Sequence, residues 1–174
     1  DHDMLDTEAL GCLPLDRARF GEGGMFAPLF EPVRRALASE PLLPRFGGGH
    51  VPASKAKLAR TQDLRELLGP NQLASLLGAD GERHWLSGDI TPDRTPALRQ
   101  YLMRELGVME LTPETLSMLT KAFLEAQPDD WVRRLYEFLG WQPALLRQGC
   151  LNDLPLVRLE NGAHVTAHAG GQPR

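Results

Sequence analysis

A stretch of the chain occurs twice, at residues 41–53 and again at residues 155–167. The two copies align without a gap at an offset of 114 residues, and six aligned positions are identical: Pro41/Pro155, Leu42/Leu156, Gly48/Gly162, His50/His164, Val51/Val165 and Ala53/Ala167. Each copy places turn residues between two extended segments, Gly47-Gly48 in the first and Asn161-Gly162 in the second, which is typical of a β-hairpin. We interpret the copies as two homologous β-hairpins.

The hairpins constrain the rest of the fold, because an isolated two-stranded hairpin is only marginally stable in water. Each must therefore pack on helices or on another strand. Pro44 and Pro52 lack the N–H that a ladder needs, which places the first copy at a sheet edge or in a free-standing ribbon. A two-residue turn in the second copy would set Leu159 opposite His164 and Arg158 opposite Val165.

Most of the sequence between the hairpins has the apolar spacing of helices. The fold class that we predict is α+β, a mainly helical block bracketed by the two hairpins. The segments are a lead-in of loops (1–24), a helix and the first hairpin (25–60), the helical block (61–150), and the second hairpin with a truncated tail (151–174). Within the block we expect two short helices over 61–69 and 70–78, a short strand at 84–87, a helix from Thr95, one continuous helix from Thr112, and a helix from Asp129.

The composition limits the function classes. The 174 residues carry a net charge of −4 with Lys and Arg dispersed, so we expect no nucleic-acid partner. Two cysteines, Cys12 and Cys150, are too few for a disulfide framework or a zinc site. No apolar run approaches the roughly 20 residues of a membrane span, and the acidic start is unlike a signal peptide. We therefore predict a cytoplasmic protein without a membrane partner, and both ends suggest a fragment of a larger multidomain protein.

Three sets of residues invite a chemical interpretation. The glycine runs lack the endings of phosphate-binding loops. His50 and His164 are better explained as structural parts of their hairpins than as catalytic residues or metal ligands. The alternative that stays open is a hydrolase-like or regulatory site in the loop of residues 84–94, which would need a deep pocket joining His84, Ser87 and Asp89.

The order of motifs over residues 26–168 resembles the region that follows the ATPase domain in large bacterial sacsin-like proteins. The resemblance rests on Pro-Leu-Leu-Pro with its glycine turn, Leu-Arg-Glu-Leu-Leu, His-Trp-Leu, Asp-Asp-Trp-Val-Arg-Arg-Leu-Tyr-Glu-Phe-Leu, and Leu-Pro-Leu-Val-Arg-Leu-Glu-Asn-Gly-Ala-His-Val. Sacsin-like proteins begin with a histidine-kinase-like, chaperone-type ATP-binding domain, whose site needs an Asn-bearing helix and an Asp-x-Gly-x-Gly turn. Neither occurs in this chain, so no catalytic, cofactor-binding or metal-binding residue is carried over.

The resemblance implies a non-catalytic linking or protein-interaction module of a chaperone-type ATPase protein. Its partners would be other domains of the parent protein and, beyond these, separate proteins. A further alternative is a segment that assists the neighbouring ATPase domain by placing an arginine, such as Arg45 or Arg60, at its nucleotide.

Overall fold

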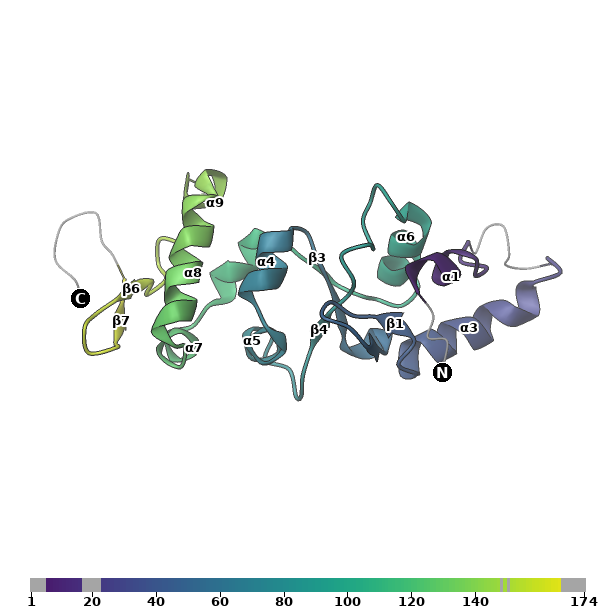
Figure 1. Cartoon of the computed structure of the whole chain (residues 1–174), viewed down its shortest axis with the longest axis horizontal. Coiled ribbons are helices and arrows are strands. Elements are labelled where there is room, and N and C mark those ends of the chain that lie inside the picture. The colour runs from purple at the N-terminus through teal and green to yellow at the C-terminus, as the bar shows by residue number, and fades with distance from the viewer. Residues whose placement is uncertain (1–5, 17–22, 148, 150, 167–174) are drawn as a thin grey trace. The chain divides into compact units, whose positions relative to one another are not determined.

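The computed structural model describes residues 6–16, 23–147, 149 and 151–166. The chain divides into two units: unit 1 comprises Asp1–Ala59 and Glu82–Glu110, and unit 2 comprises Arg60–Gly81 and Leu111–Arg174. Both units combine short helices with small sheets (Figure 1), so the predicted α+β class agrees with the mixed α and β structure. The predicted helical block of residues 61–150 contributes to both units.

Unit 1 contains the first hairpin, a small sheet and three α-helices among its described residues. Its elements are α1 (Thr7–Gly11), α3 (Ala27–Ser39), β1 (Leu43–Pro44), β2 (His50–Val51), the 3-10 helix η1 (Ala53–Lys55), β3 (Ala56–Ala59), β4 (His84–Trp85), α6 (Pro96–Arg104) and the first residue of β5 (Glu110–Leu111).

Unit 2 contains the second hairpin and the remaining helices. Its elements are α4 (Gln62–Leu67), α5 (Pro70–Leu76), the 3-10 helix η2 (Pro113–Met118), α7 (Lys121–Glu125), α8 (Asp129–Gly140), α9 (Pro143–Arg147), β6 (Val157–Arg158) and β7 (His164–Val165).

The short helix α1 lies in the range 1–24 that we predicted to be loops, and the prediction is wrong at Thr7–Gly11. Residues 1–5 and 17–22 of that range lie outside the described residues. The Asp6 carboxylate caps the helix by accepting the N–H of Ala9 at 2.7 Å. Leu10 is buried in the core of unit 1, together with Phe30 and Leu102. A single cap and one buried leucine therefore suffice for a helical turn that the surrounding Gly and Pro residues obscure in the sequence.

The strand β3 was not predicted, although it is the central strand of a three-stranded sheet in the order β4-β3-β5. It pairs in parallel with β4, with Ala56 opposite His84 and Lys57 opposite Trp85. Its residues alternate, with Ala56 and Leu58 buried and Lys57 partly exposed. Alanine and lysine are poor strand formers, and four residues give too short an alternation to stand out.

The helix predicted from Thr112 is interrupted. The chain forms the 3-10 helix η2, leaves helical geometry at Leu119, and starts α7 at Lys121. The Thr120 hydroxyl accepts the N–H of Phe123 at 3.1 Å and so caps α7. The predicted apolar stripe is buried across both segments, at Leu116, Leu119 and Phe123. Thr120, as the cap of α7, divides it into two helices.

Unit 2 is organised around α8, which packs against α4 and α9. Trp131 is fully buried, and its indole N–H donates to the carbonyl of Leu67 at 2.8 Å, which ties α8 to the end of α4. The same ring makes an edge-to-face contact with Phe123, with centroids 5.6 Å apart. One tryptophan thus joins three helices of the unit.

Both hairpins form, and their pairing is the same. Leu43 lies opposite Val51 and Pro44 opposite His50 in the first; Val157 lies opposite Val165 and Arg158 opposite His164 in the second. The register predicted for the second copy is therefore wrong by one residue.

The cause of the register difference is a longer turn than the two-residue one that we expected. The Gly162 N–H donates to the carbonyl of Leu159, and the Leu159 N–H donates to the carbonyl of Ala163. Three residues, Glu160, Asn161 and Gly162, therefore lie in the turn, and Gly162 has a positive φ of 82°.

Candidate functional site

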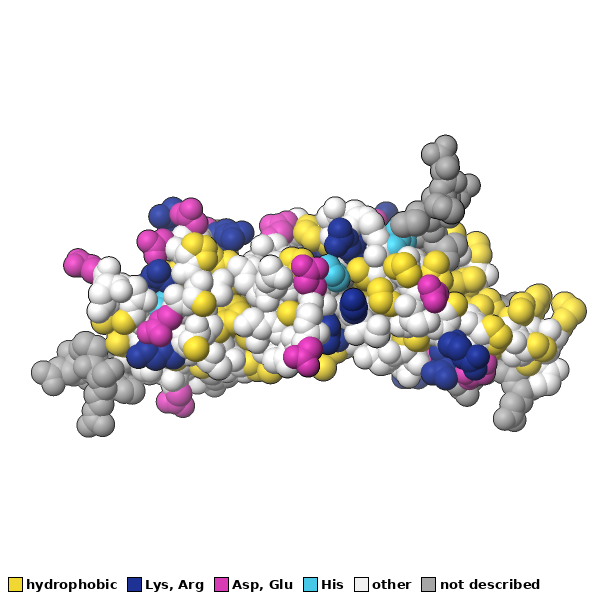
Figure 2. Space-filling view, turned by 90° about the horizontal axis from the view of Figure 1, so that it is seen from below, with side chains coloured by type: hydrophobic (Ala, Val, Ile, Leu, Met, Phe, Trp, Pro, Cys, Tyr) yellow, Lys and Arg dark blue, Asp and Glu magenta, His cyan; other side chains and the backbone are white. Residues whose placement is uncertain are grey.

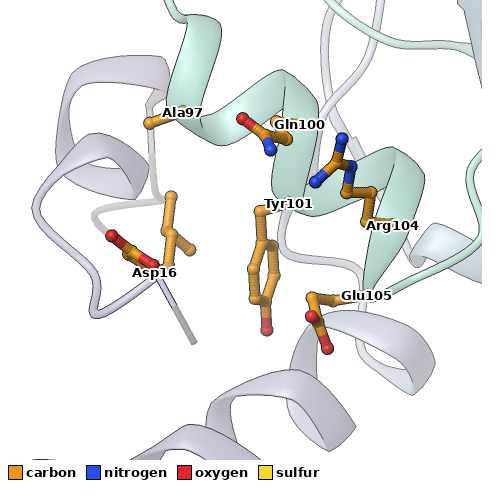
Figure 3. Close-up of a pocket in the computed structure, with 7 residues that line it drawn as sticks. Asp16, Ala97, Gln100, Tyr101, Arg104 and Glu105 are labelled. Atoms are coloured by element: carbon orange, nitrogen blue, oxygen red, sulfur yellow. The ribbon is translucent and has the colours of Figure 1, made fainter. Parts of the chain in front are cut away.

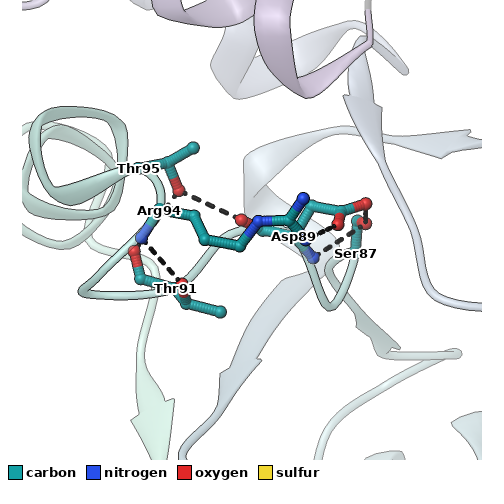
Figure 4. Close-up of polar contacts among 5 residues, drawn as sticks. All are labelled: Ser87, Asp89, Thr91, Arg94 and Thr95. Atoms are coloured by element: carbon teal, nitrogen blue, oxygen red, sulfur yellow. Dashed lines mark hydrogen bonds and ion pairs between the residues drawn. The ribbon is translucent and has the colours of Figure 1, made fainter.

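Polar contacts join several residues of the loop 84–94 and its neighbour Thr95 (Figure 4). The Ser87 hydroxyl donates to the Asp89 carboxylate at 3.1 Å and accepts the Asp89 N–H at 3.2 Å. Asp89 also forms an ion pair with Arg94, and Thr91 accepts the Arg94 N–H. These are the local bonds by which Ser, Thr and Asp side chains stabilise turns. The Ser87 hydroxyl therefore donates to a carboxylate of its own turn rather than to a histidine.

His84 lies apart from this network. Its side chain is buried, with Nε2 3.4 Å from Glu82 and Nδ1 3.5 Å from the guanidinium of Arg45. Burial, with the positive charge of Arg45, lowers its pKa below the ordinary histidine value.

A pocket of about 540 Å³ at this loop is lined by Asp89, Arg94 and Thr95 together with residues of and before α1, and His84 and Ser87 are not in its lining. The structure therefore does not bring His84, Ser87 and Asp89 together in one pocket, which is the arrangement that a hydrolase-like site needs.

His164 has a structural position in the second hairpin. It is 1% exposed, and its Nδ1 lies 3.0 Å from the carbonyl of Pro155, to which it donates. Its Nε2 lies 3.4 Å from Arg158 and accepts from it, so both nitrogens are used by a neutral ring. Burial lowers the pKa of His164, and Arg158 lowers it further. His50 occupies the matching place opposite Pro44.

Arg45, one of the two arginines that could reach a neighbouring ATPase domain, is held by its own hairpin. Its Nε donates to the carbonyl of Gly48. Arg60 has an exposed side chain, and its backbone N–H donates to Leu111 at 2.9 Å. Of the two, Arg60 is thus the one whose side chain extends from the surface of its unit.

A second pocket of unit 1, of about 520 Å³, lies between α6 and the segment after α1 (Figure 3). Tyr101 projects into it, with Gln100, Arg104 and Glu105 from the same helical stretch and Asp16 from the other side. These groups could hold a small polar molecule, but the lining contains no Ser, Cys or His that could act as a nucleophile or base.

Unit 2 carries a shallow groove of about 260 Å³ between α4 and α8. Leu67, Phe138 and Trp141 give it apolar walls, and Trp141 is 81% exposed. Its rim is formed by three acidic side chains and one basic one: Asp63, Glu66, Glu137 and Arg134. An exposed tryptophan beside charged residues is typical of a protein-interaction surface. Helical periodicity alone does not reveal that Trp141 stays exposed, because it does not show which face of a helix is left uncovered.

Unit 1 also carries exposed apolar side chains. Figure 2 shows hydrophobic side chains gathered where α3 begins, and the exposed ones at this place are Met25, Phe26 and Leu29. Apolar surface outside the core therefore occurs in both units.

The described residues contain no group of three or more His, Cys, Asp or Glu side chains placed to hold a metal ion. Cys12 is an exposed free thiol, and Cys150 lies outside the described residues. Within the same described ranges, no helix has the length and apolar character needed to cross a membrane.

Comparisons with protein-family models, with curated proteins and with solved structures give no match to this chain. The geometry of its own residues therefore carries the functional argument.

Proposed function

We propose that the chain is a non-catalytic linking and protein-interaction module of a sacsin-like, chaperone-type ATPase protein of the cytoplasm. The observation that carries this proposal is the pair of hairpins with the same pairing at an offset of 114 residues, one in each unit. We take them as copies of one element that bracket the helices between them. Repeat proteins are commonly binding proteins.

Two observations support interaction rather than chemistry. The polar side chains of the loop 84–94 bind one another, and His84 is directed to Arg45 and Glu82 instead of Ser87. The groove at Trp141 combines exposed aromatic surface with a charged rim, which suits a polypeptide partner. The sacsin-like context itself is supported by the sequence motifs.

ATP hydrolysis by the 174-residue chain tests the non-catalytic part of the proposal. We expect no saturable turnover, and the same background for His50→Ala and His164→Ala as for the unchanged chain. A turnover that either substitution abolishes would contradict the proposal. In the parent protein, Arg45→Ala should leave ATP turnover unchanged, because the Arg45 side chain is bound to its own turn; a large loss would instead favour the alternative in which this segment assists the ATPase.

A further inference from the structure

In the first hairpin, the outer edge of β1 is covered by the backbone of residues 85–87. The N–H of Ser87 donates to the carbonyl of Pro44 at 2.9 Å, and the N–H of Phe46 donates to the carbonyl of Trp85 at 2.8 Å. Between these two bonds, Arg45 and Leu86 form an antiparallel bridge. The segment 85–87 therefore adds to the hairpin through its backbone.

The second hairpin presents the same edge, because its turn bonds match those of the first. The Gly48 N–H donates to Arg45 as the Gly162 N–H donates to Leu159. The Arg45 and Leu159 N–H groups also make equivalent bonds, to Gly49 at 3.0 Å and to Ala163 at 2.8 Å.

At the offset of 114 residues, Pro44 corresponds to Arg158 and Phe46 corresponds to Glu160. Neighbouring residues of a strand direct their N–H and C=O groups to opposite sides. Arg158 C=O and Glu160 N–H therefore point to the outer edge, as Pro44 C=O and Phe46 N–H do.

Among the described residues, those two groups have no backbone partner. The Tyr136 hydroxyl covers the preceding part of the edge, since it donates to Leu156 C=O at 2.6 Å and accepts Arg158 N–H at 3.1 Å. Within residues 6–16, 23–147, 149 and 151–166, no backbone group pairs with Arg158 C=O or Glu160 N–H.

Side-chain exposure is a second observation that distinguishes the edge of β6 from the edge of β1. Leu43 is fully buried in the first hairpin, whereas Val157, at the same place in the second, is 40% exposed. Leu159, next to the open edge, is exposed too. Exposed apolar residues beside unpaired backbone groups are what an added strand covers.

We propose that the outer edge of β6, at Arg158–Glu160, binds an extended segment of the type His84-Trp85-Leu86-Ser87, contributed by another unit of the same kind as unit 1. The segment pairs antiparallel with β6 through two backbone bonds, and its apolar residues cover Val157 and Leu159. This inference rests on the proposed interaction function and names the partner.

A peptide with the sequence of Glu82–Ile90, carrying a fluorescent label, tests the proposal when it is added to the 174-residue chain. Fluorescence anisotropy should show saturable binding, whereas a peptide of the same composition in scrambled order should not bind. Glu160→Pro removes the donor N–H while fitting the first central position of the turn, where proline is favoured. It should weaken binding about tenfold, the effect of one lost hydrogen bond.

Two further variants keep the test decisive. Glu160→Ala retains the N–H and should bind as the unchanged chain does, which separates the backbone donor from the glutamate side chain. Val157→Ser leaves the turn intact and should weaken binding several-fold because it reduces the apolar surface that the peptide covers.

The proposal is overturned if the Glu82–Ile90 peptide does not bind saturably, or if Glu160→Pro and Val157→Ser both bind it as tightly as the unchanged chain. Failure of the peptide in a chain without ATP turnover removes only the proposed partner. ATP turnover that depends on His50 or His164 would remove the interaction function itself, whatever the peptide does.

Discussion

At the scale of single residues, unit 1 contains an ion pair, Arg99–Glu110, that is largely buried. Arg99 is 6% exposed, forms a salt bridge with Glu110, and donates to the carbonyl of Ile90 at 3.1 Å. It thereby joins α6 to β5 and to the end of the polar loop. A buried charge is tolerated only when its partner and its hydrogen bonds are present.

Removing one member of this pair should destabilise the protein strongly. We expect Arg99→Met to lower the free energy of unfolding by about 3–5 kcal/mol, because Glu110, whose side chain is largely enclosed, loses its ion pair with Arg99. Arg94→Met is the matched control: its ion pair with Asp89 is exposed and should contribute about 0–1 kcal/mol. Urea denaturation measures both. Equal effects would show that burial does not set the strength of the Arg99 pair.

The buried histidines make stability depend on pH. Burial lowers the pKa of His164 and of His84 in the folded chain, so the unfolded chain takes up protons first as pH falls. Stability should therefore be greatest above the unfolded pKa of about 6.5 and decline as pH falls through it towards the folded pKa.

His164→Asn should reduce that slope, since asparagine can still donate to Pro155 but does not titrate. The measurement is the free energy of unfolding by urea at a series of pH values from neutral to mildly acidic. Identical slopes for the unchanged chain and the variant would exclude His164 as a contributor. His84→Asn should reduce the slope in the same direction, because burial and Arg45 both lower its folded pKa.

At the scale of elements, the two hairpins should respond differently to the same change. Phe46→Pro removes the N–H that donates to Trp85, a buried residue, and should destabilise the chain by about 1–3 kcal/mol. Glu160→Pro removes the matching N–H, which has no backbone partner in the described ranges. It should be neutral or stabilising by up to about 1 kcal/mol, because proline restricts the unfolded chain. Urea denaturation compares the two variants, and equal destabilisation would mean that the second edge is already occupied.

Much of the element order could be predicted from short-range sequence signals. Helices begin next to Thr61 and next to Thr95, as the sequence predicted. Both glycine turns produce hairpins. These features depend on neighbouring residues alone, which is why one sequence suffices to find them.

The missed strand β3 depends on contacts between distant residues, whereas the wrong register of the second hairpin comes from its turn. Ala56–Ala59 becomes a strand because β4 and the segment at Met109 pair with it, and neither partner is near in sequence. The register of the second hairpin depended on a turn one residue longer than expected, with Gly162 in the left-handed region.

The candidate site shows the same limit. His84, Ser87 and Asp89 are close in sequence, but β4 buries His84 towards Arg45, whereas Ser87 and Asp89 lie in a turn. Trp85, Trp131 and Trp141 look alike in the sequence. Only the packing of α4 against α8 leaves Trp141 exposed and encloses Trp131.

At the scale of the whole molecule, the chain consists of two units that each contain one hairpin. In unit 1 the hairpin is completed by the segment 85–87, and in unit 2 the Tyr136 hydroxyl covers only part of the corresponding edge. The central claim is that this difference makes the second hairpin a receptor for an extended segment of another unit.

Amide hydrogen exchange, followed by NMR, tests that claim most directly at two matched positions. In the free chain, the Phe46 N–H should be protected and the Glu160 N–H should exchange rapidly. Adding the Glu82–Ile90 peptide should protect Glu160 and leave Phe46 unchanged. A Glu160 N–H that is already protected in the free chain, or that stays unprotected at saturating peptide, would contradict the account.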